Sequence, residues 1–222
     1  AIASYVGIFW AILIPVAAPF IIYSRFRYLA SRTSLMGVQF GMKPSAREYV
    51  GIFLKGMFLT IVSLGFYAAF WHHNIYKFKL ENSYYGNLKV IYTGKPKDLF
   101  MDYVLAVFLG PLTLGLYNFW FFAKVKNYRL GHTWIGNESL GSVQGAGRLK
   151  GGELLVLTLK NVLLVMVTFG IYIPWAMADF YRYFCRNVAF SGNINLNANQ
   201  ENTEARPTGG MADVVATDVL GF

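Results

Sequence analysis

The sequence predicts an all-α integral membrane protein with about four transmembrane helices, built from repeats of about fifty residues and carrying short extramembrane β segments. Three observations lead to this fold class. Of the 222 residues, 55% are hydrophobic and only 14% are charged, whereas about a quarter of the residues in soluble domains are charged. Four runs are long and apolar enough to supply the roughly 20 residues that cross a bilayer. These runs also share motifs at nearly constant spacing, as expected of an internal repeat.

The four predicted transmembrane helices cover the apolar runs at residues 4–23, 49–71, 103–123 and 154–178. Tyrosine and tryptophan are frequent near the ends of the last three runs, and such amphipathic rings lie at the headgroup level of membranes. We interpret them as interface anchors rather than as an aromatic ligand pocket. The predicted anchors are Tyr67, Trp71, Tyr117, Trp120, Tyr172 and Trp175.

The last three predicted helices share the motif [Ser/Thr]-x-Gly-x-Tyr, at residues 63–67, 113–117 and 168–172. An acidic residue stands 17 positions before the glycine of each copy, which is about 25 Å along a helix and close to the thickness of the hydrocarbon layer. We expect the acid to begin each helix, next to the positive end of its dipole, and the motif to mark the opposite interface. The acids are Glu48, Asp98 and Glu153.

Basic and aromatic stretches follow each predicted span and are expected to continue the helix into the headgroup region, where Lys and Arg reach the lipid surface. Glycine-containing segments come next and favour short strands. They begin at Gly37, Gly86, Gly136 and Gly192. Lys and Arg number ten after the first and third spans and eight after the second and fourth, so their distribution predicts no membrane orientation.

Pairs of repeats divide the chain into residues 1–92 with two spans, residues 93–197 with two spans, and a polar C-terminal tail at residues 198–222. Two-span halves keep their orientation, as in the parallel repeats of some transporters. The tail is interpreted as flexible or as a docking segment. The chain begins without Met inside an apolar run, from which we expect an N-terminally incomplete fragment.

The functional classes are narrowed by charge and by the reactive side chains. The net charge of +9 comes from basic residues beside apolar runs, which favours anionic lipid headgroups and not nucleic acid as the partner. The three histidines have no metal-ligand spacing, Cys185 is the single cysteine, and neither a Ser/His/Asp grouping nor a phosphate-binding loop is present. We therefore predict no catalytic residues, no cofactor and no metal.

Lys55, Lys160 and Asn161 are the candidate polar positions within the predicted spans. Ionisable residues inside a membrane are functional candidates because their burial is costly. Two interpretations remain open. The lysines either extend to the headgroups, or they face the bundle interior and bind an anion or an anionic headgroup.

The chain resembles the YjgN-like family, also called domain of unknown function 898, of bacterial multi-pass inner-membrane proteins. The resemblance is carried by residues 27–33, 37–41, 113–117, 168–175 and 212–222. The second repeat departs from it, with His72-His73-Asn74 where a basic run is usual. The resemblance implies a location in the bacterial inner (cytoplasmic) membrane and implies no activity.

Two functions follow as expectations. The first is a non-enzymatic scaffold or accessory subunit that binds membrane lipids or other membrane protein subunits. The second is a small-molecule or ion transporter or channel that uses the intramembrane lysines. A membrane enzyme or redox subunit is a weaker third. Convergence of Lys55, Lys160 and Asn161 on one polar cavity would favour transport.

Overall fold

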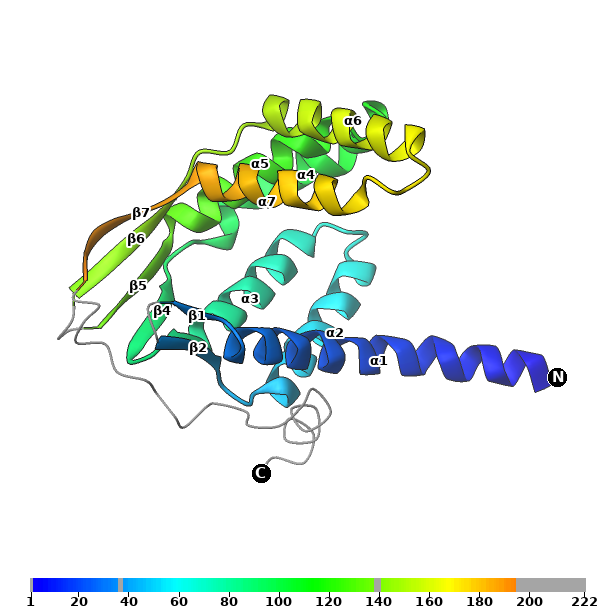
Figure 1. Ribbon diagram of the computed structural model, residues 1–222. Coiled ribbons are helices and arrows are strands. Elements are labelled where there is room, and N and C mark those ends of the chain that lie inside the picture. Colours follow the sequence, from blue (N-terminus) through cyan, green and yellow to red (C-terminus); the bar gives the residue numbers. More distant parts are fainter. Residues whose placement is uncertain (1, 36–37, 138–140, 195–222) are drawn as a thin grey trace. The chain divides into compact units, whose positions relative to one another are not determined.

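The computed structural model describes residues 2–35, 38–137 and 141–194, which form two compact units (Figure 1). The described part of the first unit is residues 2–35 and 38–92 with residues 136 and 137, and that of the second is residues 93–135 and 141–194. The predicted tail at residues 198–222 lies outside the described residues.

The first unit combines three helices with an antiparallel meander. Its elements are α1 (Ile2–Ser31), β1 (Ser34–Leu35), β2 (Val38–Met42), α2 (Ala46–Val62), α3 (Ala68–Glu81), β3 (Ser83–Tyr85) and β4 (Leu88–Tyr92). Each strand pairs antiparallel with the next, and Phe40 lies opposite Tyr85 in the register of β2 and β3. The glycine-containing segments thus form strands here, as predicted.

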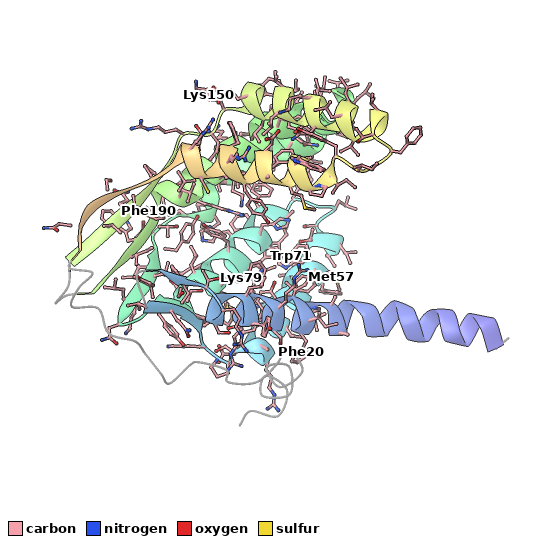
Figure 2. All side chains as sticks on the ribbon, viewed as in Figure 1. Phe20, Met57, Trp71, Lys79, Lys150 and Phe190 are labelled. Carbon is pink, nitrogen blue, oxygen red and sulfur yellow. The ribbon has the colours of Figure 1, made fainter. Side chains whose placement is uncertain are left out.

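The core of the first unit lies where α1, α2 and α3 meet. Tyr23 and Tyr49 are almost fully buried, with ring centroids 5.1 Å apart, and Phe78 packs against both. Lys79 covers one side of this core, its ammonium 4.0 Å from the ring centroid of Phe26 (Figure 2). Burial lowers the pKa of Lys79 to about 8, while contact with the aromatic face favours the charged form.

The second unit contains two helical hairpins, each followed by one or two strands. Its elements are α4 (Pro96–Leu112), α5 (Tyr117–Gly131), β5 (Thr133–Asn137, of which residues 133–135 belong to this unit), β6 (Gly141–Gly147), α6 (Gly151–Val167), α7 (Ile173–Asn187) and β7 (Val188–Ile194). β6 pairs antiparallel with β7 along its whole length, from Gly141 opposite Ile194 to Gly147 opposite Val188. Ala123, Leu149 and Leu154 form the buried core. The Asn127 amide fastens α5 to the segment before α6, since it donates to the carbonyl of Leu149 at 2.8 Å and accepts from its N–H at 2.9 Å.

Within the described residues, no helix combines the length and apolar character that crossing a bilayer requires. The predicted class, an all-α integral membrane protein with about four transmembrane helices, is therefore wrong, and so is the multi-pass description. The physical reason is visible at residues 49–71, 103–123 and 154–178, because each of these runs contains two helices joined by a sharp turn. The fold is a mixture of helical hairpins and antiparallel strands.

The motif [Ser/Thr]-x-Gly-x-Tyr forms the turn of each hairpin. In the α2–α3 hairpin, Leu64 and Gly65 both have positive φ, at 51° and 93°. The N–H of Gly65 donates to the carbonyl of Thr60 at 2.8 Å, which closes the helix end in the manner of a Schellman motif. The Ser63 hydroxyl accepts from the N–H of Tyr67 at 2.9 Å and so caps α3.

The other two hairpins repeat this turn. Leu114 and Phe169 have φ of 50° and 49°, each followed by a glycine with positive φ. The hydroxyls of Thr113 and Thr168 each accept from a tyrosine N–H at 3.1 Å and donate to a carbonyl of the preceding helix at 2.6 and 2.7 Å. The motif was expected to mark the end of a spanning helix, and it reverses the chain instead.

The turn geometry makes Gly65 a position where a side chain should destabilise the fold through the backbone alone. A β-carbon there would touch nothing, but it would have to adopt φ of 93°. We expect Gly65→Ala to lower the free energy of unfolding by about 1–2 kcal/mol, measured by denaturant unfolding followed by circular dichroism.

Gly51→Ala is the matched control, since Gly51 is exposed within α2, has no positive φ and has equally open space around it. Alanine in a helix should raise stability by about 0.5–1 kcal/mol. Equal effects of the two substitutions would contradict the assigned turn.

Candidate functional site: the facing polar positions of the helical hairpins

Lys160 of α6 forms an ion pair with Asp179 of α7. Its ammonium donates to Asp179 Oδ2 at 2.6 Å, and Arg182 Nη1 lies 3.8 Å from Oδ1. The hydrogen bond from Lys160 lowers the pKa of Asp179 most, with further contributions from the Lys160 and Arg182 charges and from a hydrogen bond of Tyr172. The same hydrogen bond raises the pKa of Lys160. The Asp179 carboxylate therefore lies at the centre of a small group of donors.

Asn161, the neighbour of Lys160, is buried in the same hairpin. Its amide nitrogen lies 3.4 Å from the carbonyl oxygen of Ala176, and its Oδ1 has no hydrogen-bond partner in the described part of the chain. Asn161 and Lys160 therefore face different surroundings although they are adjacent in sequence.

Lys55 occupies the same position in the α2–α3 hairpin as Lys160 does in the α6–α7 hairpin, ten residues before the glycine of the turn. The residue that faces it there is Asn74, which stands nine residues after Gly65 just as Asp179 stands nine after Gly170. Among the described residues, Lys55 has no ion pair. The carboxylate that neutralises Lys160 is thus replaced by a neutral amide beside Lys55.

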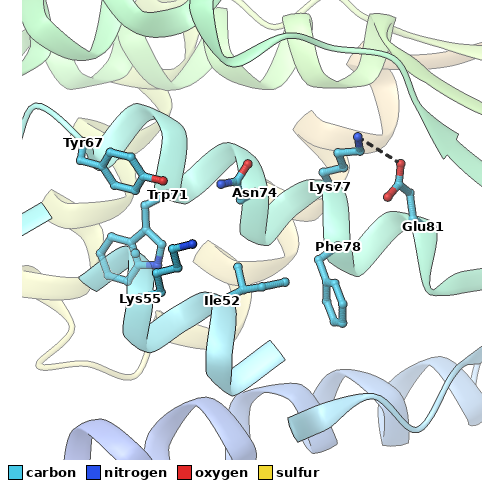
Figure 3. A pocket seen from close by; sticks show the side chains of 9 residues that line it. Ile52, Lys55, Tyr67, Trp71, Asn74, Lys77, Phe78 and Glu81 are labelled. Carbon is cyan, nitrogen blue, oxygen red and sulfur yellow. Dashed lines mark ion pairs between the residues drawn. The ribbon is translucent and has the colours of Figure 1, made fainter. Parts of the chain in front are cut away.

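A pocket of about 340 Å³ lies between α2 and α3 at this position (Figure 3). Lys55, Tyr67, Trp71 and Asn74 line it together with Lys77, which pairs with Glu81 at 3.7 Å. The Trp71 ring covers Gly56, where a β-carbon would overlap it. The indole N–H of Trp71 is buried and has no acceptor in the described chain. The pocket therefore presents several donors and one unneutralised cation.

The α4–α5 hairpin also has an ion pair between its helices, but here the acid lies on the first helix and the lysine on the second. Lys124 stands nine residues after Gly115 and donates to Asp102 Oδ1 at 2.6 Å. This hydrogen bond is the main cause of a raised Lys124 pKa. Two of the three described hairpins thus carry an ion pair between their two helices, and the described part of the α2–α3 hairpin does not.

The predicted interface anchors lie at the start of the second helix of each hairpin, either just before it or in its first turn. Tyr67 and Tyr172 precede α3 and α7, and Tyr117 is the first residue of α5. Trp120 and Trp175 are exposed, whereas Trp71 is half-buried against Gly56. Their role as interface anchors stays a prediction.

Asp179, Asp102 and Asn74 are the site residues that sequence reasoning missed. Their signal was present in the repeat, because Lys55 and Asn74 stand 105 residues before Lys160 and Asp179. Each lysine and the residue that faces it come together only because the chain reverses at the glycine of the turn.

The tips of the hairpins carry large exposed apolar side chains. Leu64, Leu114 and Phe169, the positive-φ residues of the three turns, are 86%, 94% and 97% exposed. The same ends of the hairpins present further exposed apolar residues. These are Leu112, Val167 and Ile171.

The fold and the site define a repeat protein of helical hairpins and antiparallel strands. Each hairpin has a polar level, by which we mean the polar side chains that face each other between its two helices. The chain belongs to the family described as "Bacterial protein of unknown function (DUF898)", whose model matches residues 1–112 and 146–195. This confirms the family that the sequence motifs indicated. The comparisons with curated proteins and with solved structures gave no significant match.

The ion pair predicts a perturbed titration of Asp179. Because the folded chain holds this proton less tightly than the unfolded chain, the stabilisation by Asp179 is present above the unfolded pKa and is lost as pH falls through the folded pKa. For Lys160, whose pKa is raised, it is present below the unfolded pKa and lost as pH rises through the folded pKa. We expect carboxyl-detected NMR to show Asp179 titrating below the ordinary range of aspartate.

Lys160→Met should move the Asp179 pKa upward, although Arg182 keeps part of the shift. Lys97→Met, which removes an exposed lysine at the start of α4, is the control and should leave Asp179 unchanged. If the pKa of Asp179 were the same in Lys160→Met as in the wild type, the ion pair would be contradicted.

Proposed function

We propose that this protein is a non-enzymatic scaffold or accessory protein of the bacterial inner membrane that attaches to an anionic lipid surface through the tips of its helical hairpins. Attachment of this kind needs no helix that crosses the bilayer. The apolar tips enter the outer part of the lipid layer, and the basic side chains of the hairpins contact the headgroups.

The observation that carries the proposal is the residue type at the positive-φ position of each turn. Leu64, Leu114 and Phe169 adopt φ near 50°, a conformation that costs a non-glycine residue about 1–2 kcal/mol and that Asn or Gly tolerates better. Their side chains make little contact with the rest of the chain, because they are almost fully exposed. An apolar side chain at these positions therefore contributes nothing to the stability of the fold. It would contribute to binding if the tip inserted into lipid.

The spacing along the hairpins supports the same arrangement. Lys55 and Lys160 stand ten residues before their turn glycines, which is about 15 Å along a helix. Interfacial apolar segments enter a membrane by about 5–10 Å. The lysines then lie at or just above the headgroup level, and the net charge of +9 adds attraction to anionic lipid.

The alternative, a small-molecule or ion transporter or channel, stays a prediction. Lys160 and Asn161 have separate surroundings, and Lys160 is paired with Asp179. Solute flux into vesicles that contain the protein would test it.

Vesicle flotation tests the proposal. We expect the protein to float with vesicles that contain phosphatidylglycerol and to bind phosphatidylcholine vesicles more weakly. The triple variant Leu64→Asn, Leu114→Asn, Phe169→Asn should weaken binding at least about 100-fold, since burial of each large apolar side chain is worth about 1.5–3 kcal/mol. The same variant should be as stable as the wild type or more stable, because Asn suits positive φ.

Ile91→Thr is the control, because it removes an exposed apolar side chain from β4, away from the turns. It should leave vesicle binding unchanged. A triple variant that is folded and floats like the wild type would rule out attachment by the tips.

A further inference from the structure

We propose that the pocket between α2 and α3 is a binding site for a phosphate group, with Lys55 as its principal cation. This inference does not rest on membrane attachment, because the phosphate could belong to a lipid headgroup or to a soluble phosphate ester. It concerns residues of the first unit only.

The first argument is an internal comparison between two hairpins of the same chain. In the α6–α7 hairpin, the carboxylate of Asp179 interacts with Lys160, Tyr172 and Arg182. The corresponding positions of the α2–α3 hairpin, each 105 residues earlier, keep the lysine and the tyrosine, keep a cation in place of the arginine and lose the carboxylate. They are Lys55, Tyr67, Lys77 and, in place of the aspartate, Asn74. The first unit therefore retains the groups that surround an anion but lacks the anion itself.

The second argument is the space at this position. The pocket of about 340 Å³ is lined by Lys55, Tyr67, Asn74 and Lys77, so it lies where the carboxylate is missing. Figure 3 shows the Lys55 side chain beside the Trp71 ring, with Asn74 on the adjoining wall. A volume of this size is at the lower end of ligand pockets and suits a small group and not an extended cofactor.

The third argument is an unsatisfied donor in the wall. Gly56 and Trp71 stand 105 residues before Asn161 and Ala176, so a large and a small residue have changed places between the two hairpins. Asn161 contacts the Ala176 carbonyl, whereas the buried Trp71 N–H has no acceptor among the described residues. A buried donor without an acceptor destabilises the fold, and an oxygen atom of a ligand would remove this cost.

The combination of groups selects the ligand class. The ammonium of Lys55, the amide of Asn74, the phenol of Tyr67 and the indole of Trp71 can all donate to oxygen. Lysine binds phosphate as a point charge, and Lys77 supplies a second cation for a group of charge between −1 and −2. Glu81 is the acid of the pocket and pairs with Lys77, which leaves Lys55 as the cation without a carboxylate.

Isothermal titration calorimetry with inorganic phosphate and with glycerol 3-phosphate tests the site on the full chain. We expect saturable binding with a Kd below about 10 mM. Lys55→Met should lower the affinity at least about tenfold. Asn74→Asp should abolish binding, because it returns a tethered carboxylate to the position that Asp179 has in the other hairpin. Lys97→Met is the charge-matched control and should bind like the wild type.

The reciprocal variant Asp179→Asn provides a gain of function. It should create a second phosphate site beside Lys160, detectable as a doubled stoichiometry. Thermal unfolding and circular dichroism of each variant show whether it is folded, and the Asn74→Asp variant should be more stable than the wild type because it adds an ion pair.

The outcomes separate the source of the phosphate from the existence of the site. Binding of soluble phosphate that depends on Lys55 supports a site open to soluble esters. Binding to phosphatidylglycerol vesicles alone, with the same dependence on Lys55, supports a headgroup site. Binding of neither, or binding that Lys55→Met and Asn74→Asp leave intact, overturns the proposal. The triple tip variant should lose vesicle attachment but keep soluble phosphate binding, so the two proposals fail independently.

Discussion

The rest of the structure depends on the hydrogen bonds that one hydroxyl makes to the backbone in each turn. The hydroxyl belongs to Ser63, Thr113 or Thr168. It accepts from the N–H of the tyrosine that begins or precedes the second helix, and in all three turns it also donates to a carbonyl near the end of the first helix. With two consecutive positive-φ residues, it reverses the chain within a few positions. The reversal fixes which residues face each other, so the residue ten positions before the glycine meets the residue nine positions after it. The polar level inside the α2–α3 and α6–α7 hairpins follows from this register.

Much of the local structure could be predicted from the sequence, because it depends on short-range chemistry. Glu48, Asp98 and Glu153 do lie in the first turns of α2, α4 and α6, and strands do follow the basic helices. The chain reversals could not be read from hydropathy, since an apolar run has the same composition whether it is one helix or two. Leu64 also conceals the turn, because leucine is unusual at positive φ. Only the repeated glycine carried the signal.

The candidate site was predictable in part for the same reason. Lys55 and Lys160 stand out as the cations of two equivalent apolar helices. The residues that face them lie on the following helix. Asp179 and Asn74 can therefore be identified as these residues only when the register of the hairpin is known. The contrast between them is more informative than either alone. One chain contains the same polar constellation with its counter-charge and without it, which separates the effect of the missing carboxylate from the effect of the scaffold.

The hydrogen bonding of the turns has a consequence for the medium in which they can lie. Every backbone N–H from Ser63 to Ala68 has an acceptor within the hairpin, and the same holds from Thr113 to Asn118 and from Thr168 to Ile173. Turns usually depend on water for some of these bonds, and hydrocarbon offers none. A tip whose N–H groups are satisfied internally loses little when it is dehydrated. The membrane attachment proposed above would therefore require no local unfolding of the turns.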